Sequence, residues 1–228
     1  MKKIRLLTVQ FDTNIKGYEL PAFRGAIVDK VGKENIVFHN HLSGNTYVYR
    51  YPLIQYKIIK NSPAIQCIDY GVDEIHKFFE NSSWDLKISD RILEMKIKSI
   101  QLNQFTMQVW DKKFDYSIQN WIALNQDNYK KYKEIESLSD RISFLEKTLT
   151  ANIISFAKGI EWTIDKPIEL KIKDLKETKL VSLKGEKIMG FNVDFNCNVF
   201  IPNYIGLGKS VSLGYGMVKQ KIANRLQH

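Results

Sequence analysis

The stretch Gly206-Leu207-Gly208-Lys209-Ser210-Val211-Ser212-Leu213-Gly214-Tyr215-Gly216 holds two glycine–hydrophobic–glycine triplets with five residues between them. Glycine is favoured where the backbone needs a positive φ or where another molecule must approach the main chain closely. Two such triplets around a lysine and two serines make a loop rich in N–H donors beside a cation. The stretch therefore predicts a phosphate-holding loop, and the alternative is a plain hairpin with glycine corners.

Two known phosphate motifs do not match this stretch. A Walker A loop needs a glycine five residues before Gly208, where the chain has Asn203. A dinucleotide fingerprint needs a glycine three residues after Gly208, where the chain has Val211, and it normally lies early in a βαβ unit. Both motifs are therefore excluded.

The charge of the chain indicates a polyanionic partner. The formal net charge is +9 and the isoelectric point is near 9.3, and nucleic acid or a membrane surface is the simplest partner for such an excess. Residues 35–68 and 209–228 contain no acidic side chain. Two acid-free stretches far apart in sequence suit a phosphate backbone laid across both. The alternative is a basic surface without a specific partner.

Composition limits the class of protein. With 228 residues, 44% hydrophobic and 26% charged, the chain is an ordinary globular protein of one large or two small domains. No apolar run approaches the roughly 20 residues that cross a bilayer, and the N-terminus lacks the pattern of a secretory signal. Cys67 and Cys197 are far apart, so neither a disulfide framework nor a zinc site is predicted. We expect a cytoplasmic protein.

Apolar periodicity in the first half predicts a β-α-β-β-α-β order, the ferredoxin-like arrangement. Pro21 opens the first helix and Gly32 closes it. The expected segments are a strand over 3–11, a helix over 21–32, one or two strands over 46–59, a strand over 64–68, a helix over 72–79 and extended chain over 92–109.

The second half has the same kind of inventory. Ser137 to Asp140 resembles a capping box before an amphipathic helix that stops at Gly159. Around it we expect a strand over 114–124, a polar helix over 128–135, and strands over 168–172, 179–183, 189–200 and 215–222. The prediction is an α+β fold of two tandem ferredoxin-like (RRM-like, βαββαβ) modules, 1–110 and 111–228, the second carrying the glycine-rich loop.

The glycine–hydrophobic–glycine spacing near the C-terminus resembles the signature of the RAMP (repeat-associated mysterious protein) superfamily of RNA binders. With an N-terminal strand, an early helix and histidine just after it, the chain resembles the CRISPR-associated endoribonucleases that process precursor CRISPR RNA. The resemblance implies two ferredoxin-like modules and cleavage of CRISPR repeat RNA without metal or other cofactor, giving 5′-hydroxyl and 2′,3′-cyclic phosphate ends. It also implies repeat RNA and other CRISPR-associated proteins as partners. From the composition we expect no membrane partner, and we expect a monomer or homodimer.

Two histidines, His39 and His41, form the histidine cluster of the sequence. Residues i and i+2 of extended backbone point the same way, so both imidazoles could face one phosphate. One would take the proton of the 2′-hydroxyl while the other protonates the leaving 5′-oxygen. We favour His41 as the dominant residue, with His39 assisting. One alternative for the pair is a polar turn. A metal site is another, but no third ligand lies nearby in sequence.

Tyrosine and basic residues surround this cluster. Tyr47 is a third catalytic candidate, as a group that orients the phosphate, although strand tyrosines are often half-buried sheet residues. Arg50 and Lys57 are candidate RNA-binding cations, and Arg24 is a weaker one. His76 and His228 are not expected to act. The residues expected to bind RNA through the loop are Gly206, Gly208, Lys209, Ser210, Ser212, Gly214 and Gly216.

Two other functions fit the same residues. A non-catalytic RNA-binding RAMP subunit of a CRISPR interference complex would use the glycine loop but would not need the histidine pair. In a basic nucleotide-binding protein unrelated to RNA, ATP would displace the bound ligand and RNA would not. A cleavage assay and a competition assay separate the three.

Overall fold

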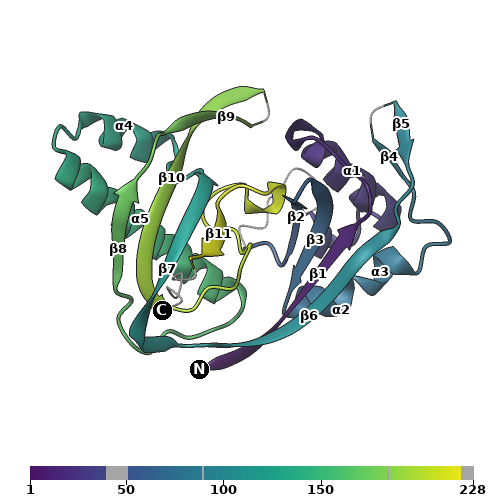
Figure 1. Ribbon diagram of the computed structural model, residues 1–228, viewed down its shortest axis with the longest axis horizontal. Coiled ribbons are helices and arrows are strands. Elements are labelled where there is room, and N and C mark those ends of the chain that lie inside the picture. The colour runs from purple at the N-terminus through teal and green to yellow at the C-terminus, as the bar shows by residue number, and fades with distance from the viewer. Residues whose placement is uncertain (40–50, 89, 184, 222–228) are drawn as a thin grey trace, which may run out of the picture.

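The computed structural model describes residues 1–39, 51–88, 90–183 and 185–221, and His41, Tyr47, Arg50 and His228 lie outside these ranges. Two antiparallel sheets form two arms, with helices on their outer sides (Figure 1). The segment that contains the glycine loop lies between the arms, beside β7 of one sheet and β2 of the other.

The first sheet is built from β1 (Lys2–Phe11), β2 (Ile54–Ile59), β3 (Ser62–Ile68) and β6 (Ile97–Met107). Its order is β2-β3-β1-β6, and every neighbouring pair is antiparallel. The last strand of this half therefore pairs with the first, and the third lies between the first and the second.

Helices cover one face of this sheet. They are η1 (Gly17–Glu19), α1 (Leu20–Val31), η2 (Ile36–Phe38), α2 (Tyr70–Glu74) and α3 (His76–Phe79), followed by the hairpin β4 (Leu86–Ile88) and β5 (Arg91–Leu93). Phe11 of β1 makes edge-to-face contacts with Phe23 of α1 and Phe78 of α3. These rings belong to one of the two hydrophobic clusters of the described residues.

The other face of the first sheet meets the second half of the chain. Side chains alternate between the faces of a strand, and Ile4, Leu6 and Ile68 point away from the helices into the core of the second half. Apolar burial therefore joins the two arms at their base.

The second sheet is built from β7 (Val109–Trp121), β8 (Leu170–Leu175), β9 (Lys179–Leu183), β10 (Glu186–Val199) and β11 (Met217–Gln220). Its order is β11-β7-β10-β8, all antiparallel, and β9 pairs with the start of β10. When β9 is left aside, the last strand of this half again pairs with its first, and its third strand again lies between the first and the second. The connection from β10 to β11 contains the glycine loop, residues 206–216, with the short helix η3 (Val211–Leu213) in place of α2 and α3.

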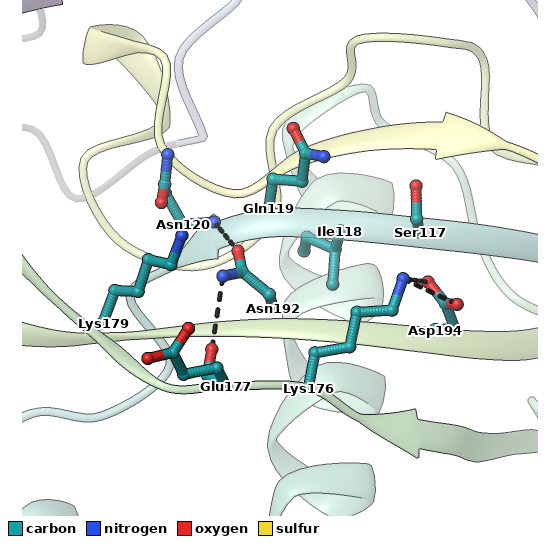
Figure 2. Close-up of a pocket in the computed structure, with 9 residues that line it drawn as sticks. All are labelled: Ser117, Ile118, Gln119, Asn120, Lys176, Glu177, Lys179, Asn192 and Asp194. Carbon is teal, nitrogen blue, oxygen red and sulfur yellow. Dashed lines mark hydrogen bonds and ion pairs between the residues drawn. The ribbon is translucent and has the colours of Figure 1, made fainter.

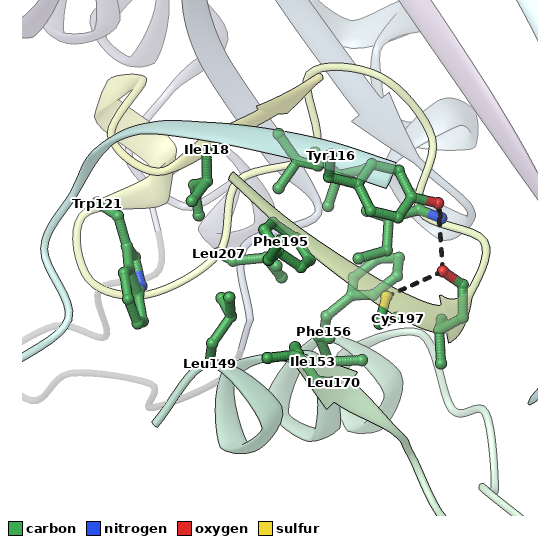
Figure 3. Close-up of a cluster of buried hydrophobic side chains, with 14 of the residues drawn as sticks. Tyr116, Ile118, Trp121, Leu149, Ile153, Phe156, Leu170, Phe195, Cys197 and Leu207 are labelled. Atoms are coloured by element: carbon green, nitrogen blue, oxygen red, sulfur yellow. Dashed lines mark hydrogen bonds between the residues drawn. The ribbon is translucent and has the colours of Figure 1, made fainter. Parts of the chain in front are cut away.

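Two helices cover one face of the second sheet, α4 (Gln126–Glu134) and α5 (Leu138–Gly159). Ser137 caps α5 by accepting a hydrogen bond from the Asp140 N–H, as its sequence predicts. Leu149, Ile153 and Phe156 of α5 pack on the sheet, and Leu207 of the glycine loop enters the same core (Figure 3). The loop is thus attached to the core by an apolar side chain between its first two glycines.

The predicted elements lie close to the observed ones, with local differences. The helix expected over 72–79 is two short helices, and Asp69, which precedes them, has a φ of 49°. The extended chain expected over 92–109 includes one strand of the β4–β5 hairpin before β6 begins. In the part of the chain that the structure describes, no helix is both long enough and apolar enough to span a bilayer.

Candidate nucleic-acid interface

The two glycine triplets lie side by side and form the neck of the loop. The Leu207 N–H donates to the Gly216 carbonyl at 2.9 Å, and Gly206 pairs with Met217 in an antiparallel bridge. Gly216 has a φ of +64°, and a Cβ there would lie 1.9 Å from the Leu207 carbonyl oxygen. The neck therefore requires glycine, both for its backbone angle and for its close packing.

Beyond the neck, the tip of the loop exposes polar groups. Ser210 and Gly214 adopt left-handed backbone conformations on either side of η3. Val211 is buried beneath the tip, whereas Ser210 and Ser212 are partly exposed and Lys209 is exposed. The tip thus offers hydroxyl groups and one cation to solvent, as the phosphate-holding hypothesis requires.

One side of the loop rests on the end of β7. The Gly216 N–H donates to the Asn120 carbonyl at 3.2 Å, and the Lys209 N–H donates to the Ile122 carbonyl at 3.0 Å. A Cβ on Gly208 would lie 2.7 Å from the ring of Trp121. The second half of the chain therefore holds the loop by its backbone.

The other side of the loop is held by side chains from the first half. The Tyr51 hydroxyl donates to the Gly206 carbonyl at 2.8 Å, and the Gly206 N–H donates to Gln55 Oε1 at 3.2 Å. Gln55 Nε2 in turn donates to the Tyr51 hydroxyl at 2.8 Å. Both backbone polar groups of Gly206 are thus satisfied by side chains some 150 residues earlier in the sequence.

Lys57 lies behind the loop and has no exposed surface. Its ammonium donates to Gln55 Oε1 at 2.8 Å and, among the described residues, forms no ion pair. Burial lowers the pKa of Lys57 to about 7, because a charged amine is poorly solvated there. The sequence predicts Lys57 as a surface cation; in the structure it belongs instead to the seat of the loop.

The same seat supports the segment that carries His39. The Tyr56 hydroxyl donates to the Phe38 carbonyl at 3.1 Å, while a Cβ on Gly214 would lie 3.4 Å from the Tyr56 carbonyl oxygen and 2.9 Å from Leu20 of α1. One strand residue therefore contacts the loop with its backbone and the His39 segment with its side chain.

His39 ends η2 and is partly exposed. Its Nε2 lies 2.8 Å from the Lys33 carbonyl, and Arg24 Nη2 donates to the His39 carbonyl at 2.6 Å. Burial lowers the pKa of Arg24, and among the described residues its Nε has no hydrogen-bond partner. Arg24, a weak candidate in the sequence, thus lies directly beside the predicted catalytic segment. His76 begins α3, away from the loop.

Two family descriptions match the chain and together cover almost all of it. The Cas6b N-terminal domain matches residues 2–106, and the Cas6b C-terminal domain matches residues 108–221. The chain belongs to the Cas6b family. This confirms the resemblance to CRISPR-associated RNA-processing endoribonucleases that the glycine loop and early histidines indicate.

Solved structures and a relative agree with the Cas6b assignment. A crystal structure of Cas6b is 29% identical, with a TM-score of 0.88 over 96% of this chain and 100% of that chain. A CRISPR RNA processing endoribonuclease Cas6b is 26% identical, with a TM-score of 0.75 over the same shares. The uncharacterized protein MJ0978 of Methanocaldococcus jannaschii is 39% identical over 101 residues, which are 44% of this chain and 67% of that protein.

A polar recess of about 440 Å³ lies on the open face of the second sheet (Figure 2). Asn192 Oδ1 accepts from the Asn120 N–H at 2.9 Å, so the recess adjoins the residue whose carbonyl holds Gly216. Lys176 and Lys179 line its other side. In this Cas6b-family chain the glycine loop therefore continues into a surface of amides and cations.

Asp194 is the acidic side chain of this recess with the deepest burial. Burial alone would raise its pKa, but hydrogen bonds from Lys176 at 2.9 Å and Lys221 at 2.8 Å outweigh burial and hold the pKa below its ordinary value. The Asp194 carboxylate is therefore neutralised locally by two lysines, and Glu177 is the other carboxylate among the residues that line the recess.

A second polar recess of about 440 Å³ lies between the arms. Thr8, Gln10 and Gln101 of the first sheet face Tyr204 and Gln220 of the second half across it. Within the described ranges no group of three or more histidine, cysteine, aspartate or glutamate side chains could hold a metal ion. The polar surfaces beside the loop carry amides, hydroxyls and amines.

Proposed function

We propose that this protein is an endoribonuclease that cuts CRISPR repeat RNA. The observation that carries the proposal is the shared seat on β2: Tyr56 contacts the glycine loop at Gly214 and the His39 segment at Phe38. RNA held by the loop would therefore lie beside the histidines. The Cas6b structures to which the chain is similar include one described as a CRISPR RNA processing endoribonuclease.

The proposed reaction needs only proton transfer and positioning. The 2′-oxygen of the ribose attacks the adjacent phosphorus, a new 2′-O–P bond forms, and the P–O5′ bond breaks. One imidazole takes the 2′-hydroxyl proton, and the other gives a proton to the leaving 5′-oxygen. We assign His41 the dominant role, with His39 and Tyr47 assisting. The products are a 2′,3′-cyclic phosphate and a 5′-hydroxyl, and no metal ion takes part.

RNA contacts are proposed for the tip of the loop. The side chains of Lys209, Ser210 and Ser212 would bind phosphate, with Gly208 and Gly214 allowing the RNA to approach the main chain closely, and Arg50 would add a cation. Gly206 and Gly216 are buried and shape the neck. Lys57 acts from behind the loop because it has no exposed surface. The two polar recesses would continue the RNA track on either side.

The fold proposed with this function is two ferredoxin-like modules. Both halves have the strand order last, first, third, second, and β6 ends at Met107 just before β7 begins at Val109. This placement supports the predicted domains 1–110 and 111–228. A cytoplasmic location, a monomer or homodimer, and other CRISPR-associated partners remain predictions.

End-labelled synthetic CRISPR repeat RNAs, incubated with the protein in EDTA, test the function. Cleavage at one site that leaves a cyclic phosphate is expected, and a 2′-deoxy nucleotide before the scissile phosphate should abolish it. His41→Ala should lower the single-turnover rate by roughly 10²–10⁴, as for a lost general acid or base. A full rate in the His39→Ala, His41→Ala double variant would reject the histidine assignment, and strict metal dependence would reject the mechanism.

A further inference from the structure

Two glutamines lie side by side on the face of the first sheet that meets the second half of the chain. Gln55 of β2 and Gln66 of β3 are paired across the strands, and neither has exposed surface. Both side chains reach the second half of the chain. Gln66 Nε2 donates to the Asn203 carbonyl at 3.2 Å, whereas Gln55 contacts Gly206, the first glycine of the loop.

The hydrogen bonds of Gln55 use its whole amide group. Its oxygen accepts from the Gly206 N–H and from Lys57 Nζ, and its nitrogen donates to the Tyr51 hydroxyl and to the Pro52 carbonyl at 3.1 Å. A primary amide has two donor hydrogens and one oxygen with two lone pairs. Each is occupied, so the orientation of the Gln55 side chain is fixed. By contrast, Gln66 Oε1 is buried and has no hydrogen-bond partner in the described part of the chain.

The strand that carries Gln55 contacts the loop at both ends. Gln55 holds Gly206, and two residues at the next positions, Tyr56 and Lys57, lie against Gly214. Tyr56 also holds Phe38, next to His39. A shift of the loop along β2 would therefore change its distance from the His39 segment directly.

We propose that Gln55 is a positioning residue for RNA cleavage: its amide fixes the glycine loop on β2 and so sets where bound RNA lies relative to the histidines. The inference rests on the proposed function for its consequence in catalysis. The positioning itself depends only on the contacts of Gln55. A misplacement of about 1 Å in reacting groups can cost roughly 10²-fold in rate.

Gln66 supplies the matched control, because it has the same side chain, the same burial and the neighbouring position, but contacts Asn203 and not the loop. Gln55→Leu should lower the single-turnover rate at saturating repeat RNA by roughly 10–100-fold. Gln66→Leu should leave this rate within about threefold of the native protein, although both variants lose a buried hydrogen bond. Equal rates for the two variants would overturn the proposal.

Gln55→Glu separates positioning from general destabilisation. Its carboxylate can still accept from Gly206 and from Lys57, so it should retain more of the native rate than Gln55→Leu at equal RNA saturation. A loss that instead follows the Tm of the variants, or a weaker RNA affinity with an unchanged rate, would contradict a positioning role. If Gln55→Leu does not fold, the single-turnover rate of Gln55→Glu is compared with that of Gln66→Leu instead.

Hydrogen exchange without RNA tests the positioning independently of any activity. In Gln55→Leu, amides of residues 206–216 should exchange faster than in the native protein and in Gln66→Leu, because opening of the loop exposes them. Unchanged exchange over this stretch would overturn the proposal even if the native protein cuts repeat RNA. If exchange over this stretch is faster in Gln55→Leu but the native protein cuts no repeat RNA, the role of Gln55 in holding the loop is supported and the proposed function is rejected.

Discussion

The two halves of the molecule share a strand order but differ in the connection before their last strand. In the first half α2, α3 and the β4–β5 hairpin lie between β3 and β6, whereas in the second half the glycine loop joins β10 to β11. Phe78 anchors the helical connection against Phe11 of β1. The loop depends on Tyr51, Gln55 and Tyr56 from the other half.

The difference shows how one position in a fold serves two purposes. The short helices of the first half are stabilised mainly by their packing on an apolar seat. The glycine loop instead has its first glycine held by side chains of the other half, so residues outside the loop fix its backbone. We therefore expect changes in the helical connection to alter stability alone, and changes in the loop and its seat to alter RNA handling as well as stability.

The largest effect is expected for Phe78→Ala. Phe78 has no exposed surface, and removal of a buried phenyl ring costs about 3–5 kcal/mol of unfolding free energy. Denaturant unfolding measures the loss, and repeat-RNA affinity of the folded fraction should be unchanged. Tyr70→Ala, an exposed aromatic in the same connection, should cost less than about 0.5 kcal/mol. A large loss of affinity in Phe78→Ala would break the division of roles.

Lys57→Met should raise stability in a pH-dependent manner. The pKa of Lys57 is lowered by burial from 10.5 to about 7, so the unfolded chain binds the proton more tightly between these pH values. Native stability therefore rises with pH in this window. The variant lacks this pH dependence. Below pH 7 its unfolding free energy should exceed that of the native protein by on the order of a few kcal/mol, and this difference should narrow towards pH 10. Parallel stability curves for the two proteins would contradict the buried cation.

Gly216→Ala should destabilise the loop by at least about 1–2 kcal/mol, the cost of a left-handed backbone for alanine, with a further cost from the contact with Leu207. Gly25→Ala is the matched change in the first half, because Gly25 lies in α1 with open space around it. It should stabilise the protein by about 0.5–1 kcal/mol. Thermal unfolding of both variants measures the two changes in stability. Changes of the same sign in Gly216→Ala and Gly25→Ala would refute the contrast.

The smallest effect is expected for Lys209→Ala. Removal of one exposed cation should leave unfolding unchanged and reduce the salt dependence of RNA binding by about 0.7 in log–log slope, the value for one phosphate of a single strand. Lys87→Ala, an exposed cation on β4, should leave the slope unchanged. Equal slopes for Lys209→Ala and the native protein would show that the loop tip does not bind phosphate.

Much of the fold follows from local patterns in the sequence. Pro21 and Gly32 bracket α1, Ser137 caps α5, and the strand over 179–183 is observed at the predicted bounds. These signals are local, since caps and alternation depend on neighbouring residues. The break between α2 and α3 was not predicted, because tertiary packing decides such short helices.

The seat of the loop was only partly predictable. Lys57 is a plausible surface cation in the sequence, and nothing local shows that β2 is covered on both faces. Gln55 was not singled out, although Gln55 and Lys57 alternate with Ile54, Tyr56 and Ile58. Two polar side chains at one face of a short strand are the available signal. Their partners, Gly206 and the second half, are too distant in sequence to be inferred from it.

One residue, Gln108, separates β6 from β7, and these two strands belong to different sheets (Figure 1). Backbone rotation at such a short junction is restricted on both sides by ladder hydrogen bonds. The angle between the arms is thus built into the chain and does not depend on a hinge. We expect a polynucleotide that binds in the recess between the arms to adapt its own shape to that recess.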